Sequence, residues 1–144
     1  MNNDILTFLA DHGTQPTTVL QLAFGAMVAI LFLQSGLDKV FNWKSEKEFL
    51  TSHFQKSILK GSVPLLLPVI TLLEISAGAL SAIGHVMVHL GYGRGLGLLG
   101  MLLGTASIIM LFFGQRVAKD YAGAAALVPY FLMCAAGVYV FTMA

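Results

Sequence analysis

The sequence predicts an all-α fold, namely an integral membrane four-helix bundle with a short amphipathic interfacial helix between its first two membrane helices. Of the 144 residues, 57% are hydrophobic and 10% are charged, whereas soluble domains carry roughly 25% charged residues. Four apolar segments of about 20 residues or more are long enough to cross a hydrocarbon core of about 30 Å. They lack the polar stripe of a soluble bundle helix. We therefore predict one domain, 1–144, with membrane helices at residues 19–41, 66–90, 95–115 and 121–143.

The first membrane helix is expected to stay in the mature protein. The preceding segment "MNNDILTFLADHG" contains Asp4 where a signal peptide has its basic region, and no small-residue cleavage pattern follows. The helix then ends in "ILFLQSGLDKVF", where Gln34, Asp38 and Lys39 interrupt the apolar run.

The basic residues predict the orientation in the membrane. All Lys and Arg residues except Arg94 fall in or beside the first and third loops: Lys39, Lys44, Lys47, Lys56, Lys60, Arg116 and Lys119. Short loops rich in Lys and Arg remain in the cytoplasm. The first and third loops are therefore predicted to be cytoplasmic, and both termini extracytoplasmic, in a bacterial inner membrane.

The first loop is predicted to contain the interfacial helix, at residues 45–60. Ser45 and Glu48 have the S-x-x-E spacing of a capping box, and Gly61 is a natural stop. One side of this helix is apolar: Phe49, Leu50, Phe54 and Ile58. It is expected either to lie on the cytoplasmic membrane surface or to pack on the protein's own loops.

The start of the second membrane helix decides whether two charged residues meet. Lys39 lies near the cytoplasmic end of the first helix, and Glu74 lies inside the second. If the second helix begins at Pro68, their depths differ by about 6 Å, which the side chains can span. If it begins at Val63, the difference is about 13 Å, which is too far without tilt.

The alternative to such a pair is that each charge is satisfied separately. Lys39 then extends to the headgroups and Asp38 faces water. Glu74 is then protonated or bonded to Ser76, Thr105 or Ser107. Together with Gln34, Lys39, Glu74 and Asp38 are the candidate intramembrane polar site, because charges within membrane spans are rare and costly.

Small residues are frequent in the third and fourth membrane helices. Gly93 and Gly97 are four residues apart, as are Gly100 and Gly104. This spacing lets helix backbones approach closely, either between two copies of the chain or within one bundle.

Metal and thiol chemistry have little basis in the sequence. Cys134 is the single cysteine and is interpreted as a small buried apolar residue. His85 and His89 share a helix face and are a weak candidate for metal binding, but no third ligand is indicated, and two interfacial side chains are the simpler interpretation. No metal is predicted. The net charge of +1 and the lack of a basic run give no indication of nucleic-acid binding.

Two segments resemble the DoxX-like family of small membrane proteins. "FGAMVAILFLQSGLDKVF" is similar to the first-helix pattern of that family through Phe32, Gly36 and Lys39. "PVITLLEISAGALSAIG" is similar to the second-helix pattern through Glu74, Gly78 and Gly84. The resemblance implies a four-helix inner-membrane protein. Some relatives are small subunits of thiosulfate:quinone oxidoreductase, and others accompany redox or detoxifying enzymes, but no catalytic residue set carries over.

Three alternative functions are considered, and the first is the main expectation. The first is an accessory or structural subunit of a redox-linked membrane complex, with no cofactor or enzyme activity of its own and with lipids and other membrane subunits, or a second copy, as partners. The second is the quinone-facing membrane subunit of an oxidoreductase, with Lys39 and Glu74 near the quinone headgroup. The third is a small proton or solute carrier centred on Glu74.

Overall fold

The computed structural model describes residues 2–12 and 15–143. These residues form six helices in the order α1 (Asn2–Asp11), α2 (Pro16–Phe41), α3 (Trp43–His53), α4 (Val63–His89), α5 (Gly95–Val117) and α6 (Tyr121–Thr142). The predicted all-α fold with four long apolar helices is confirmed. The predicted domain, 1–144, also contains residues 1, 13, 14 and 144, which lie outside the described residues.

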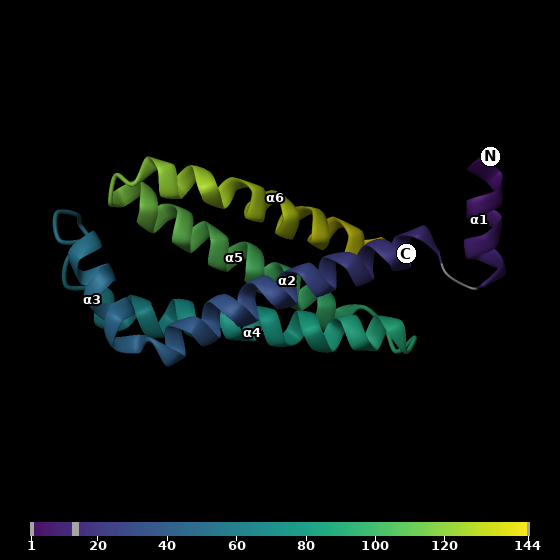
Figure 1. Ribbon diagram of the computed structural model, residues 1–144, viewed down its shortest axis with the longest axis horizontal. Coiled ribbons are helices and arrows are strands. Elements are labelled where there is room, and N and C mark those ends of the chain that lie inside the picture. The colour runs from purple at the N-terminus through teal and green to yellow at the C-terminus, as the bar shows by residue number, and fades with distance from the viewer. Residues whose placement is uncertain (1, 13–14, 144) are drawn as a thin grey trace.

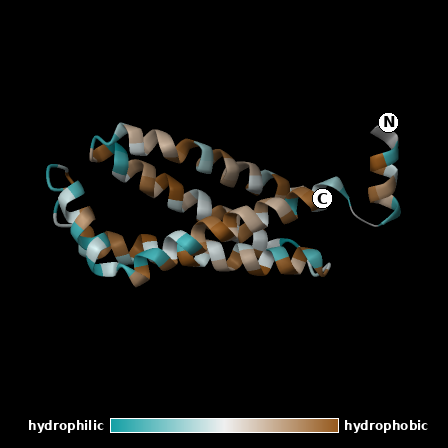
Figure 2. Cartoon of the chain, in the orientation of Figure 1, coloured by the Kyte–Doolittle hydropathy of each residue, from teal (hydrophilic) through white to brown (hydrophobic). Residues whose placement is uncertain are grey.

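Four of the helices, α2, α4, α5 and α6, are long and apolar enough to cross a membrane. They form the elongated bundle in Figure 1, in which α2 packs most extensively on α4, α4 on α5 and α5 on α6. Helix α2 also contacts α5 and α6, so the bundle closes on itself. Figure 2 shows hydrophobic residues along all four helices, whereas hydrophilic residues are concentrated around α3. We call the end of the bundle that carries α3 the α3 end.

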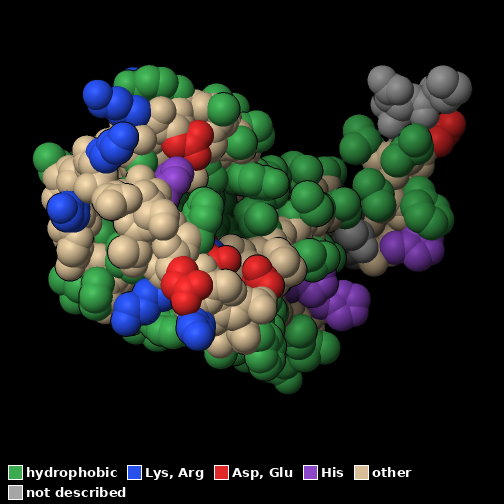
Figure 3. Space-filling model, turned by 60° about the vertical axis from the view of Figure 1, so that its left-hand side comes forward, with side chains coloured by type: hydrophobic (Ala, Val, Ile, Leu, Met, Phe, Trp, Pro, Cys, Tyr) green, Lys and Arg blue, Asp and Glu red, His purple; other side chains and the backbone are tan. Residues whose placement is uncertain are grey.

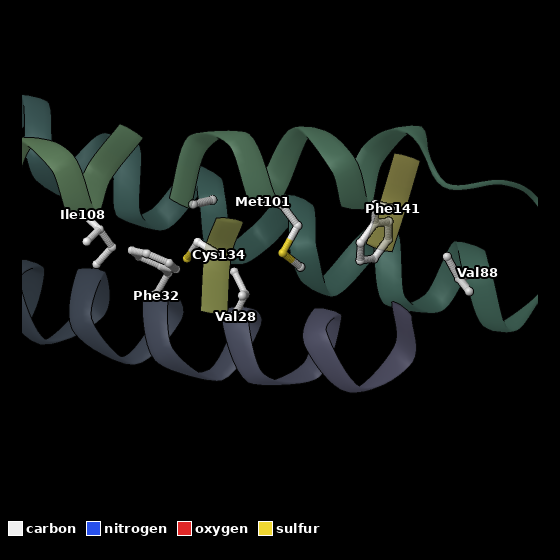
Figure 4. Close-up of a cluster of buried hydrophobic side chains, with 8 residues drawn as sticks. Val28, Phe32, Val88, Met101, Ile108, Cys134 and Phe141 are labelled. Carbon is white, nitrogen blue, oxygen red and sulfur yellow. The ribbon is translucent and has the colours of Figure 1, made fainter. Parts of the chain in front are cut away.

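The core joins all four long helices. Its buried side chains include Phe32 of α2, Met101 and Ile108 of α5, and Cys134 and Phe141 of α6. Figure 4 shows these side chains following one another along the space between the ribbons, from Ile108 to Phe141. Cys134 is fully buried in this cluster, as a small apolar residue would be.

Helix boundaries differ from the prediction at several ends. Helix α2 begins at Pro16 rather than residue 19, because proline is favourable in the first helical turn, where its missing N–H would have no partner. Helix α4 begins at Val63 rather than residue 66, with Pro64 in its first turn and Pro68 inside the helix. The later start at Pro68 is therefore not the one the chain adopts.

The helix predicted between the first two membrane helices is present but shorter than predicted. Helix α3 ends at His53 rather than residue 60, and hydrogen-bonded turns follow it up to Gly61. The cause is tertiary, because Phe54 turns inward and is buried against the start of α4. The predicted capping box is also absent, since Ser45 lies inside α3 and its hydroxyl donates to the carbonyl of Asn42.

Helix α1 was not predicted. It spans Asn2–Asp11 and lies apart from the four long helices, beyond the end of the bundle opposite α3 (Figure 1). Its apolar residues Ile5, Leu6 and Phe8 are all exposed. The sequence pattern of so short a segment gave no indication that it would be helical.

Three glycines of α5 pack closely on neighbouring helices of the bundle. A methyl group on Gly97 would overlap the ring of Phe141, and one on Gly100 would overlap Ser81 of α4. A methyl group on Gly104 would lie 2.9 Å from the ring of Phe32. Gly93 differs, because it lies in the loop before α5 with a φ of 118° and has no neighbour at its Cβ position.

Candidate functional site

Lys39 and Glu74 meet inside the bundle. The Lys39 Nζ lies 3.0 Å from Glu74 Oε2, in a contact that is an ion pair rather than an aligned hydrogen bond. The side chain of Glu74 is 1% exposed and that of Lys39 is 14% exposed. Of the two arrangements considered from the sequence, the structure therefore adopts the direct pair.

Ser35 bridges the two charged side chains. Its hydroxyl donates to Glu74 Oε1 at 3.2 Å and accepts a hydrogen bond from Lys39 Nζ at 3.1 Å. Ser35 was missing from the predicted site, although it lies one helical turn before Lys39 and therefore on the same face of α2. The two hydrogen bonds of Ser35 and the Lys39–Glu74 ion pair together offset part of the cost of burying these charges.

The pair forms although α4 begins at Val63, so the predicted dependence on a later start at Pro68 was wrong. The prediction placed the ends of the two helices at the same depth. In the structure Gly25 lies against His85, and Gly36 lies against Ile75. With this register the last residue of α2, Phe41, lies opposite about residue 70, and the first two turns of α4 extend roughly 10 Å beyond α2. The overhang removes the expected difference in depth.

Two glycines make the close approach of α2 and α4 feasible. A methyl group on Gly36 would lie 2.6 Å from Ile75 Cγ1, and one on Gly78 would lie 2.6 Å from the backbone nitrogen of Leu33. Such distances leave no room for a side chain. We call this part of the α2–α4 interface the clasp and define it by Ser35, Gly36, Lys39, Glu74 and Gly78.

The other predicted members of the polar site do not join the clasp. Gln34 and Asp38 are both exposed. The side-chain Nδ2 of Asn42, the C-cap residue of α2, donates to Asp38 Oδ1 at 2.9 Å and to the Asp38 carbonyl at 3.0 Å, so Asp38 is engaged at the end of its own helix. Two of the three alternative partners proposed for Glu74 are engaged elsewhere, since Thr105 and Ser107 each donate to a carbonyl one turn earlier in α5.

The histidine pair of α4 is divided between two environments. Nδ1 of His85 lies 2.9 Å from the carbonyl oxygen of Leu22, which ties α4 to α2. His89 is exposed. Within residues 2–12 and 15–143, no group of three His, Cys, Asp or Glu side chains is placed to hold a metal ion.

A second polar contact lies at the α3 end and was not predicted. Nε2 of His53 lies 2.6 Å from Oε1 of Gln115 in α5, and 3.8 Å from Oδ2 of Asp120. His53 also stacks on Phe49, with ring centroids 5.3 Å apart. The 62 positions between His53 and Gln115 leave no local signal in the sequence, so only the fold brings these residues together.

This contact lies at the edge of an apolar groove between α3, α4 and α5, with a volume of about 370 Å³. The lining includes Phe49, His53, Leu66, Ile70, Phe113 and Gln115. We call this feature the groove. Figure 3 shows Lys and Arg side chains gathered around the α3 end of the bundle, yet none of them lines the groove itself. The groove is therefore a neutral, apolar recess beside a basic surface.

Comparisons with family models, with curated proteins and with solved structures find no match to this chain.

Proposed function

We propose that this chain is a DoxX-like integral membrane protein that acts as an accessory or structural subunit of a redox-linked membrane complex. The observation that carries the proposal is the clasp. Gly36 and Lys39 belong to one of the two segments that resemble the family, and Glu74 and Gly78 belong to the other. In the fold Lys39 pairs with Glu74 across α2 and α4. Gly36 lies against Ile75 and Glu74, and Gly78 lies against Leu33 of α2.

The clasp supports a structural role because the charged and polar side chains of the two segments face each other inside the bundle. Its ion pair neutralises a buried charge, and its glycines permit close packing in a medium that supplies little hydrophobic driving force between helices. Residues used in this way hold a bundle together and leave the outer apolar faces for lipid and for other membrane subunits or a second copy.

The proposed orientation places the α3 end in the cytoplasm and both termini outside, in a bacterial inner membrane. It is supported by the basic residues, since those of the first and third loops share the α3 end while Arg94 lies in the loop between α4 and α5 at the other end. Cysteine accessibility tests this orientation directly: in a Cys134→Ala background, Ser52→Cys should react with an impermeant maleimide only after the cells are opened.

The accessory role is tested by extracting the protein in a mild detergent from the membranes of cells that express it at its natural level. We expect native mass spectrometry to detect an assembly of fixed stoichiometry that contains an oxidoreductase. Lys39→Met should reduce the yield of that assembly, whereas Gln34→Leu, at an exposed position of the same helix, should not. A chain that is monomeric in every extract would contradict the proposal.

A second candidate is the quinone-facing subunit of an oxidoreductase, and the groove is the observation that favours it. The head of a lipid-soluble quinone needs an apolar recess with a small number of polar groups near the membrane surface. The groove meets this description better than Lys39 and Glu74, because Glu74 is enclosed by Ser35 and Lys39. The same enclosure gives no support to a carrier in which Glu74 exchanges protons with water.

A further inference from the structure

The groove has the size and the access of a ligand site. Its volume of about 370 Å³ lies at the lower end of the range of roughly 300–1,000 Å³ for small-molecule sites. Two of its lining residues on α5, Ile109 and Phe113, are 53% and 54% exposed. Both lie within α5, one of the four helices long and apolar enough to span a membrane, so in a bilayer the groove would open sideways toward lipid. A ligand dissolved in the bilayer can enter it without passing through water.

The polar part of the groove is small and oriented. The imidazole of His53 stacks on Phe49 and meets Phe54 edge-on, with ring centroids 5.3 Å apart in both contacts. Its Nε2 lies 2.6 Å from the side-chain oxygen Oε1 of Gln115, and because that oxygen can only accept, the contact requires the proton on Nε2. That bond leaves the amide NH2 of Gln115 as a donor, since it bonds to no other residue that the structure describes. The groove therefore offers a hydrogen-bond donor beside aromatic rings.

The absence of charged side chains from the described lining determines which membrane-soluble ligands fit the groove. Within the described part of the chain, no Asp, Glu, Lys or Arg lines the groove. A phosphate headgroup or a fatty-acid carboxylate would thus lose hydration without gaining a cation. A neutral head loses far less, and a carbonyl oxygen on that head would accept from Gln115.

We propose that the groove binds a neutral, lipid-soluble quinone, with its flat ring against Phe49 and Phe113, one carbonyl oxygen at the Gln115 amide and its apolar tail extending between α4 and α5 into the bilayer. This site deepens the second candidate function and rests on it. It places the head on residues of α3 and α5 and leaves the clasp as a structural element.

The single tryptophan of the chain provides the readout. Trp43 begins α3 and lies six residues before Phe49, which is about 9 Å along the helix. Quinones quench indole fluorescence at such distances. With the purified protein in lipid nanodiscs, titration with decylubiquinone should give a saturable component of quenching in addition to the linear component that arises from quinone dissolved in the bilayer.

Two variants test the site, and a third is their matched control. Gln115→Leu removes the donor and should weaken the saturable component about tenfold, as expected for losing one buried hydrogen bond. Ile109→Phe places a ring in the opening of the groove and should abolish that component. Gln34→Leu makes the same chemical change at an exposed position of α2, outside the groove, and should leave the titration unchanged. Thermal unfolding of each variant identifies any that has lost its fold.

Three results would overturn the inference: a titration with no saturable component, identical curves for Gln115→Leu and Gln34→Leu, or equal displacement of the quinone by decanol or oleate, which lack the carbonyl-bearing ring. These outcomes are independent of the accessory role, because complex formation is measured in membrane extracts and quinone binding in the isolated chain.

Discussion

The clasp and the groove are both polar features in an apolar bundle, and they differ in whether their polar atoms are used. In the clasp, an ion pair and two hydrogen bonds join the carboxylate, ammonium and hydroxyl groups of three side chains, and glycines bring the helices into contact. In the groove, a histidine and a glutamine bond to each other beside an empty volume. The first arrangement stabilises a helix pair, whereas the second leaves a donor and space for another molecule.

The largest effect should come from breaking the charge pair of the clasp. Lys39→Met leaves the Glu74 carboxylate buried without its counter-ion, which in other proteins costs about 3–5 kcal/mol. We expect a loss of that order in the free energy of unfolding in mixed detergent micelles. The double variant Lys39→Met with Glu74→Met removes both charges and should recover most of the loss. If the single and double variants are equally unstable, the ion pair is not the source of the effect.

Filling the glycine contact of the clasp should have the next largest effect. A side chain at Gly78 would collide with the backbone of Leu33, which cannot move without shifting α2. Gly78→Val should therefore lower the unfolding free energy by about 2–3 kcal/mol, within the usual range for overpacking. Gly95→Ala is the control, since nothing lies within 4 Å of the added methyl group. Equal stability of Gly78→Val and wild type would contradict the close packing of α2 on α4.

A smaller effect is expected for the groove in the absence of ligand. Gln115→Leu removes one hydrogen bond from His53, a half-buried side chain that water can still reach. The loss of stability should be about 0.5–1 kcal/mol, well below that of Lys39→Met. A loss as large as that of Lys39→Met would mean that the His53–Gln115 contact is structural, as in the clasp. The measurement is the same detergent unfolding titration.

The smallest effect is expected just outside the clasp. Asp38 is adjacent to Lys39 in sequence, but it is exposed and bonds only to Asn42 among the described residues. Asp38→Asn should change stability by less than about 0.5 kcal/mol, as exposed substitutions usually do. A large effect, measured beside Lys39→Met in the same titration, would show that the clasp extends to the surface of α2.

The sequence was sufficient for the fold because lipid imposes a simple rule: each long apolar run forms a spanning helix. It also identified Lys39 and Glu74, since charges within such runs are rare. It was not sufficient for the register of α2 on α4, which depends on the contacts of Gly25, Gly36 and Gly78 with the opposite helix. Helix periodicity says which residues share a face but not how far one helix slides along another.

The end of α3 and the groove were missed for a related reason. Residues 54–60 continue an amphipathic pattern, and local propensity alone favours a longer helix. Burial of Phe54 against Val63 and Leu67 overrides that preference. The groove follows from this turn, because α3 is then held beside α4 and α5 and brings His53 to Gln115. Both features depend on contacts between residues far apart in the chain.

The overhang of α4 beyond α2 also sets how the protein fits bilayers of different thickness. A helix of 27 residues is about 40 Å long, whereas a hydrocarbon core is about 30 Å thick. In the proposed orientation, the overhanging turns would hold α3 and the mouth of the groove near the boundary between hydrocarbon and headgroups. A thicker bilayer would immerse that mouth in acyl chains, and a thinner one would bring it closer to water. Through hydrophobic mismatch, bilayer thickness would thereby control entry of lipid-soluble molecules into the groove.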